Sequence, residues 1–388
     1  MNTDQSPSPT AAPPWLVPRA AYVHVPFCAH RCAYCDFAIA VGKDDLIERY
    51  LDALAAELAG LGRPQPVQTL FLGGGTPTYL SAAQLGRLLG NVLRWLPLRP
   101  GHEFSIEANP GTLDAEKVAV LARHGVTRVS LGAQSFDPRL LGVLERDHAP
   151  DEVPRAVACV KERIGQVSLD LIFGVPGQSV AAWQADLERA LALGPDHVST
   201  YGLTYEKGTP LWKQRQRGAV RALDEEAERA LYGLAIDTLE AAGFEHYEIS
   251  NFARPGRRCR HNEVYWANHA YFGFGMGAAR YVGGRRELNT RDLHGYIRKA
   301  LAGESVTLQS EELPPWERAR ETMAVQLRRV EGVERRAFRE QTGFDLDDMA
   351  GPAISRHVEL GLLHHDSNRV RLTREGKYVA DGVIENLL

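Results

Sequence analysis

The sequence has no long apolar run. No segment reaches the roughly 18 uninterrupted apolar residues that a transmembrane helix needs, so we expect no membrane insertion. It also has no large excess of one charge, since 45 Lys and Arg face 49 Asp and Glu for a net charge of -4. That balance gives no reason to expect nucleic acid as the main partner. Residues 1–18 contain no basic opening and no apolar stretch, and their five prolines predict a disordered tail rather than a signal peptide.

Cysteine is scarce, with five in 388 residues, yet three of them fall in one short stretch. Cys28, Cys32 and Cys35 have the spacing C-x3-C-x2-C, close enough for one loop to surround a single metal centre. Three soft thiolates suit iron-sulfur or zinc, but structural zinc takes four ligands and an iron-sulfur cube normally takes four cysteines. No fourth ligand of the right kind follows, since Asp36 and Phe37 come next. The pattern predicts a 4Fe-4S cube on three cysteines, with one iron open to a small molecule.

From residue 19 onward, short β-rich runs alternate with helical patterns, which is typical of βα units and a parallel sheet. The expected strands are 20–25, 67–72, 103–108, 127–132, 167–173 and 196–203. Six units are too few for a closed eight-stranded barrel, and the pattern alone does not separate an open doubly wound sheet from a partial barrel.

Capping patterns predict where several helices begin. Asp45 and Glu48 form a capping pattern at the start of a helix expected over 45–61, and Ser81 with Gln84 begins a second helix in the same way. The caps expected for later helices are Asp114, Ser179 and Asp224.

Polar residues and glycines follow the expected strands. Residues 73–77 read Gly-Gly-Gly-Thr-Pro after the second strand, Glu107 and Gln134 end the third and fourth, and Asp170 lies on the fifth. Ligands bind at the carboxyl ends of parallel strands in both candidate architectures, and the cysteine loop follows the first strand. We therefore expect these residues to form one ring around the metal centre.

The stretch from Tyr22 to Phe37 resembles the radical S-adenosylmethionine (SAM) superfamily, in the branch of oxygen-independent coproporphyrinogen dehydrogenases and HemW-type heme chaperones. The resemblance covers most of residues 19–388 and implies an α/β fold, a partial (β/α)6 barrel with SAM at the open iron of the cluster. The SAM contacts that it implies are Tyr22, Tyr34, Gly74, Gly75, Thr76, Glu107, Gln134, Arg146 and Asp170.

Residues 243–283 break the βα rhythm and are rich in aromatic residues, histidine and arginine. The run from His261 to Trp266 resembles the H-N-x-x-Y-W region linked with heme binding in HemW-type chaperones, which implies His261 as the axial heme ligand. Without the resemblance, the better interpretation is that His261 and Trp266 pack a crossover segment under the barrel.

Four arginines, at positions 254, 257, 258 and 260, lie in seven residues with no acid among them. They suit porphyrin propionates, and a solvated basic loop is the alternative. Cys259 lies among them, and an exposed thiol beside arginines would have a lowered pKa and a ligand or redox role.

From residue 311 the expected elements are helices over 315–330, 333–341 and 346–361, a hairpin over 362–372 and a last helix. This order predicts a small winged-helix-like domain. Residues 311–388 hold 12 Lys and Arg against 15 Asp and Glu, whereas a DNA-reading surface should be basic. The expected domains are therefore a 1–18 tail, a 19–250 barrel, a 251–310 heme-binding crossover segment and a 311–388 lid or docking module.

Three functions fit these features: a heme chaperone, a coproporphyrinogen III dehydrogenase and a DNA-binding regulator. Charge disfavours the regulator. The dehydrogenases carry a further cysteine where this chain has Phe37, and they tend to have a longer N-terminal region. Both departures match the chaperone branch, so we expect a chaperone that passes heme to an unidentified acceptor protein. An oxygen-labile type of cysteine site places it in a reducing cytoplasm.

Overall fold

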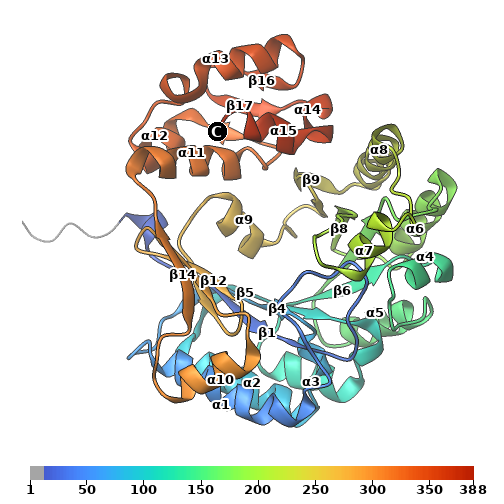
Figure 1. Cartoon of the computed structure of the whole chain (residues 1–388), viewed down its shortest axis with the longest axis vertical. Helices are drawn as coiled ribbons and strands as arrows, with labels where there is room; N and C mark the ends of the chain where they lie inside the picture. The colour runs from blue at the N-terminus through green and yellow to red at the C-terminus, as the bar shows by residue number, and fades with distance from the viewer. Residues whose placement is uncertain (1–12) are drawn as a thin grey trace, which may run out of the picture.

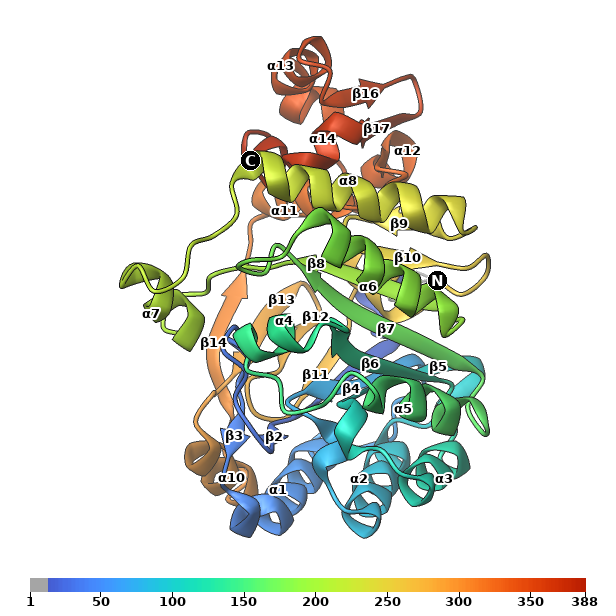
Figure 2. The ribbon, with the colours of Figure 1, turned by 90° about the vertical axis from the view of Figure 1, so that its right-hand side faces the viewer.

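Six parallel strands form the centre of the fold in the computed structural model, which describes residues 13–388. They pair in chain order, each with the next, and Figure 2 shows them fanned into a partial barrel. The strands are β1 (Ala20–Val25), β4 (Val67–Gly74), β5 (Leu98–Ala108), β6 (Arg128–Gln134), β7 (Gln166–Phe173) and β8 (His197–Gly202). The six expected strands and the partial-barrel fold are confirmed.

Helices cover the outer face of this sheet (Figure 1). Their apolar side chains pack against the strands in one continuous core. They are α1 (Ile47–Ala59), α2 (Ala82–Trp95), α3 (Ala115–Arg123), α4 (Pro138–Val143), α5 (Glu152–Lys161), α6 (Val180–Ala192) and α8 (Glu225–Ala241), while the short α7 (Pro210–Gln216) follows β8.

The capping predictions hold for α2, α3, α6 and α8. Ser81 and Gln84 form the reciprocal capping box, and the side chains of Asp114, Ser179 and Asp224 accept backbone N–H groups. The prediction for α1 is wrong, because its first turn has no side-chain cap. Glu48 instead pairs with Arg87 of α2, across the surface between the two helices.

The segment after α8 supplies strands to both edges of the sheet. β10 (Asn251–Ala253) pairs antiparallel with β8, and β9 (Glu245–Glu248) pairs with β10. At the opposite edge, β11 (Phe272–Phe274) runs parallel to β1. Between these edges, α9 (Arg260–Trp266) lies across the open side of the barrel (Figure 1).

A second sheet joins the barrel to the C-terminal domain. It consists of β12 (Ala279–Val282), β13 (Arg285–Asn289) and β14 (Thr307–Glu312), with α10 (Leu293–Leu301) between the last two strands. The expected boundary between residues 310 and 311 therefore falls inside a paired strand and is misplaced.

The C-terminal domain has the expected winged-helix-like order and its own apolar core. Its elements are α11 (Pro315–Gln326), β15 (Val333–Glu334), α12 (Arg335–Thr342), α13 (Leu346–Glu359), β16 (Leu363–His365), β17 (Arg369–Leu372), α14 (Arg374–Tyr378) and α15 (Ala380–Glu385). The domain is docked on the barrel: Arg374 donates to both carboxylate oxygens of Asp237 on α8, at 2.6 and 2.8 Å. Tyr378 packs edge-on against Tyr232.

The disordered tail expected over residues 1–18 extends too far along the chain. Pro14–Leu16 form a 3-10 helix, and the Trp15 carbonyl accepts the Ala270 N–H at 2.8 Å. The pairing with Ala270 gives these residues a fixed partner, and the rest of the expected tail, residues 1–12, lies outside the described residues. No helix among residues 13–388 is both long and apolar enough to cross a membrane.

Candidate functional site

The three clustered cysteines lie in a loop that is closed at its base. The loop leaves β2 (Phe27–Cys28) and returns through β3 (Ala40–Val41), and these two short strands pair with each other. Its middle is also anchored, because the Ala33 N–H donates to the Leu144 carbonyl at 3.0 Å and the Ala33 carbonyl accepts the Leu211 N–H at 2.9 Å. The backbone of the cysteine loop is thus fixed at both ends and at its centre.

The cysteine sulfurs have partners that suit thiolates. Arg146 Nη1 donates to Cys32 Sγ at 3.2 Å, and Cys28 Sγ lies 3.5 Å from Thr76 Oγ1. Burial raises the pKa of the Cys28 thiol to about 12 and also raises that of Cys35, so nearby positive charge is needed to hold these sulfurs as thiolates.

These sulfur donors fit an iron-sulfur cube. Among residues 13–388, no three His, Cys, Asp or Glu side chains converge on a position for one ion. A 4Fe-4S cube needs a different geometry, because each cysteine binds a separate iron and the three sulfurs need not converge on one point. Three cysteine sulfurs are the donors that such a cluster prefers.

One cavity of about 440 Å³ collects most of the predicted site residues. It opens beside the cysteine loop, at the carboxyl ends of the parallel strands. Its lining includes Cys28, Cys32, Tyr34, Cys35, Gly74, Gly75, Thr76, Glu107, Gln134, Arg146 and Asp170. Of the predicted residues, only Tyr22 and His261 do not line it.

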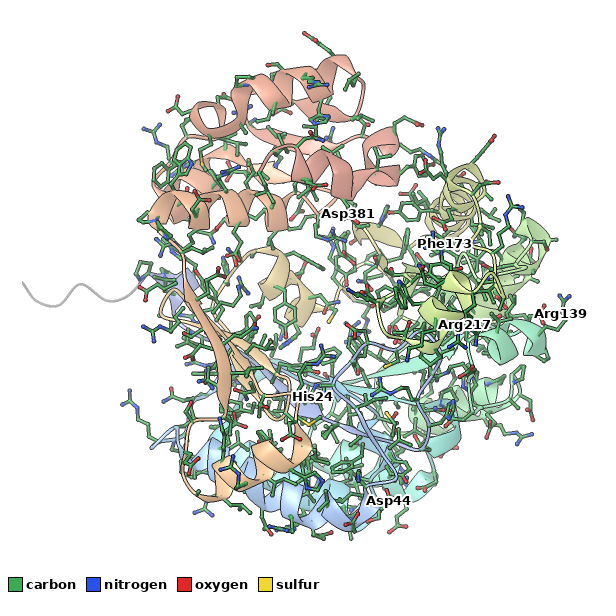
Figure 3. The ribbon with its side chains drawn as sticks, in the orientation of Figure 1. His24, Asp44, Arg139, Phe173, Arg217 and Asp381 are labelled. Carbon is green, nitrogen blue, oxygen red and sulfur yellow. The ribbon has the colours of Figure 1, made fainter. Side chains whose placement is uncertain are left out.

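Glycine is required at the end of β4. Gly74 has φ of +111°, and a Cβ there would lie 2.3 Å from the ring of His24, which Figure 3 shows near the middle of the barrel. A Cβ on Gly75 would lie 2.6 Å from the Pro26 carbonyl oxygen. The Gly74 N–H donates to the Glu107 carboxylate at 2.9 Å, so this turn also orients the acid.

Two buried acids face the interior of the barrel. Burial raises the pKa of Glu107 to about 7, with a further contribution from the charge of Asp170, and burial raises the pKa of Asp170 to about 6. The Ser130 hydroxyl is within 3.0 Å of both Asp170 carboxylate oxygens. A ligand that brings N–H or O–H donors, or a positive charge, would stabilise the ionised forms.

Gln134 ends β6 in a left-handed conformation, with φ of 62°. Such a conformation is uncommon for a residue other than glycine, and it occurs often where a side chain must line a ligand site. It coincides with a register shift between β6 and β7.

A second cavity, of about 360 Å³, adjoins the first inside the barrel. The two share Phe37, Glu107, Ser130, Asp170 and Tyr201 as lining residues. Its other lining residues include Tyr22, Phe71, Arg128, His197, Cys259, His261, Asn262 and Tyr265.

Tyr22 lies in the second cavity rather than beside the cysteines. Its ring stacks with Phe71, and its hydroxyl lies 3.0 Å from His24 Nδ1. Tyr22 is linked to the cysteine loop through His24, whose Nε2 donates to the carbonyl of Ala38 at 2.8 Å.

His261 is 1% exposed, and both of its ring nitrogens are engaged. Nδ1 lies 3.0 Å from Thr69 Oγ1, and Nε2 lies 2.8 Å from the Tyr265 hydroxyl. Burial lowers the pKa of His261 to about 3, so the imidazole is neutral, which is the form that binds metals. Nε2 becomes a ligand only when it parts from Tyr265.

Two of the four arginines around residue 257 have acidic partners. Arg258 lies within 3.0 Å of Glu245 and within 4.0 Å of Glu263 and Glu331. Arg257 lies 3.8 Å from Asp196. Arg257 and Arg258 are therefore paired with acids within the protein, whereas Arg254 and Arg260 donate to backbone carbonyls. The binding of porphyrin propionates by this loop stays a prediction.

Cys259 is buried, contrary to the expectation of an exposed, acidic thiol. It is 3% exposed, and burial raises its pKa to about 12. It lies beside an ion pair that the sequence analysis missed: Glu103 and Arg128, 3.4 Å apart. Glu103 accepts the N–H groups of residues 260 and 261, and Arg128 donates to the carbonyls of residues 257 and 258. This pair fixes the start of α9.

The partial barrel, the three-cysteine loop after its first strand and the cavity at the strand ends define a radical SAM protein. The family model of the Radical SAM superfamily matches residues 22–190, and that of the HemN C-terminal domain matches residues 313–379.

Relatives over nearly the whole chain give the narrower family. The heme chaperone HemW of Bacillus subtilis is 37% identical over 94% of this chain and 98% of its own length. The heme chaperone HemW of Synechocystis is 40% identical over 82% of this chain and 80% of its own length. The chain therefore belongs to the HemW family.

The fold also has a close match among solved structures. Coproporphyrinogen III oxidase (HemN) from Escherichia coli superposes with a TM-score of 0.84, covering 96% of this chain and 90% of that chain. The two sequences are 21% identical, so the match establishes the shared fold alone.

Proposed function

We propose that the protein is a heme chaperone, which binds heme and passes it to an acceptor protein. The observation that carries this proposal is its similarity, over nearly its whole length, to proteins named heme chaperone HemW. Phe37 adds support, because it stands where the coproporphyrinogen dehydrogenases have a further cysteine.

Cys28, Cys32 and Cys35 would hold a 4Fe-4S cluster, which supplies one-electron reducing chemistry when bound. The Arg146 guanidinium donates to Cys32 Sγ and adds positive charge beside the thiolates. The oxygen sensitivity of such a cluster favours a reducing compartment, and we propose the cytoplasm.

The cavity of about 440 Å³ beside the cysteine loop would bind SAM. Gly74 and Gly75 allow the backbone to approach a ligand closely, and Glu107 and Asp170 offer acceptors for its N–H and O–H groups. Tyr34, Thr76, Gln134 and Arg146 complete the proposed contacts, whereas Tyr22 would act through His24.

His261 is the proposed ligand for heme iron. Its imidazole is neutral and lines the second cavity. This cavity adjoins the proposed SAM cavity, and Glu107 and Asp170 line both. Binding of heme iron would replace the hydrogen bond between Nε2 and Tyr265.

The test is an anaerobic titration of the cluster-loaded chain with hemin, followed by transfer to an apo-haemoprotein. Stoichiometric binding and transfer would support the chaperone. In the same preparation, SAM and a low-potential reductant are added with coproporphyrinogen III. Formation of protoporphyrinogen would instead establish the alternative, an oxygen-independent coproporphyrinogen III dehydrogenase, whose fold this chain shares.

A further inference from the structure

Phe37 exposes an aromatic ring beside the cysteine loop. Its exposed fraction is 64%, although aromatic side chains are usually mostly buried. Exposure of a single apolar side chain is ordinary, but this ring lines both cavities at the place where they meet. Tyr201, at the end of β8, also lines both cavities and is 42% exposed.

The backbone on both sides of Phe37 is held in place. Arg31 Nη1 donates to the Cys35 carbonyl at 3.2 Å, and Arg291 donates to the Asp36 carbonyl. On the other side, the Ala38 carbonyl accepts a hydrogen bond from His24. The backbone that carries the ring is therefore held before any ligand arrives, which lowers the entropy cost of binding to it.

The same anchors place two guanidiniums on the backbone of residues 35 and 36, next to Phe37 in the sequence. Arg31 is exposed, and within residues 13–388 its guanidinium has no carboxylate at ion-pair distance. Arg291 lies 3.7 Å from Asp36, which balances part of its charge. A flat apolar surface flanked by guanidiniums complements a planar macrocycle that has carboxylates on one edge.

We propose that Phe37 and Tyr201 bind the face of a porphyrin at the shared mouth of the two cavities, and that Arg31 and Arg291 bind its carboxylates. This inference rests on the proposed function, because it assumes that the ligand of the chaperone is a tetrapyrrole. It assigns the carboxylates to the cysteine loop and β13–α10 connection, rather than to the ion-paired arginines around residue 257.

The first experiment titrates the full, cluster-loaded chain with two probes, hemin and metal-free protoporphyrin IX. Removing the ring in Phe37→Ala is expected to lower the binding affinity for both probes by about tenfold, since stacking and burial of the ring do not depend on the iron. Phe37→Trp should keep near-native affinity for both probes. Leu308→Ala is the matched control, because Leu308 is 59% exposed on β14 and lines neither cavity.

The second experiment tests the carboxylate partner. Arg31→Gln should lower the affinity for protoporphyrin IX several-fold at low salt. Added salt should then lower the affinity of this variant less than it lowers that of the wild type. Equal affinities of wild type, Phe37→Ala and Arg31→Gln for protoporphyrin IX would overturn the inference while leaving the chaperone intact. Failure of the wild type to bind either probe would overturn the proposed function as well.

Discussion

His261 and Tyr265 lie one turn apart on α9, and the tyrosine hydroxyl hydrogen-bonds to Nε2 of the imidazole at 2.8 Å. The other ring nitrogen bonds to Thr69 on β4. Both ring nitrogens of the neutral imidazole are thus engaged, and Nε2 shares a hydrogen bond with the hydroxyl. Any metal that binds His261 competes with a residue of the same motif.

The variant Tyr265→Phe should bind hemin about fivefold more tightly, because a neutral hydrogen bond that contributes about 1 kcal/mol no longer competes for Nε2. The Soret band in an anaerobic titration reports the affinity. Thr69→Val is the control, since it removes the partner of Nδ1 only. If His261→Ala and Tyr265→Phe both titrate like the wild type, His261 is not the ligand.

Each of the variants Cys28→Ala, Cys32→Ala and Cys35→Ala should lose the iron-sulfur cluster. Loss is expected because a cube on three cysteines has no spare protein ligand. Iron and sulfide analysis after anaerobic reconstitution measures it, with about four irons per chain expected in the wild type. Cys159→Ala, on α5 and away from the cavity, should retain the full iron content.

The variant Gly74→Ala should lose SAM binding and be destabilised by about 1–3 kcal/mol. Its Cβ would collide with the His24 ring, and φ of +111° is strained for any L residue. Equilibrium dialysis with SAM and urea unfolding measure the two effects. Gly90→Ala, in the middle of α2 with nothing within 4 Å of the added Cβ, should be neutral or slightly stabilising. Native-like SAM binding by Gly74→Ala would contradict the proposed approach of the ligand.

The contribution of Glu107 to the free energy of unfolding of the SAM-free chain, measured as the difference between the wild type and Glu107→Gln, should fall as pH rises from about 4.5 through 7. Glu107 has an ordinary pKa of 4.5, and burial raises its pKa to about 7 in the folded chain. The folded state therefore binds the proton more tightly, and this stabilisation is complete below pH 4.5 and lost above pH 7. The loss is at most about 3 kcal/mol. Urea unfolding at pH 5 and pH 8 measures it.

The variant Glu107→Gln should remove the part of the pH dependence that Glu107 contributes, and the raised pKa of Asp170 leaves a second part that is lost by about pH 6. Asp170→Asn should move its midpoint to lower pH, since the charge of Asp170 contributes to the raised pKa of Glu107. An unchanged pH profile in Glu107→Gln would assign the dependence to other groups.

Local sequence patterns were enough to predict the barrel strands and to single out the three-cysteine loop. Each strand from 20–25 to 196–203 is a β-rich run followed by a helical pattern, and the cysteines lie within eight residues of one another. Short edge strands such as Phe272–Phe274 lack the length to show a period, so they were missed. β5 begins five residues before the expected strand. Its first half was missed because it contains Pro100 and Gly101, two residue types that are rare in strands.

The state of individual side chains depended on contacts that no local pattern contains. Arg258 lies in a run of arginines with no acid among them, yet the fold brings Glu245 and Glu331 to it as well as Glu263. Cys259 was expected to be exposed for the same reason, and the Glu103–Arg128 pair from the sheet buries it. Long-range pairing decided burial, charge and pKa, while local pattern decided the elements.

The bond from Arg291 to Asp36 joins residues 255 positions apart and sets an order of events in the cell. At a translation rate of about 5–20 residues per second, the cysteine loop leaves the ribosome roughly 13–50 s before its arginine anchor has been made. The glycines that pack against His24 and Ala38 from β11 onward are equally late. A nascent chain thus carries the cysteine loop with its anchors at Leu144 and Leu211 well before the contacts from residues 275–291 complete its support.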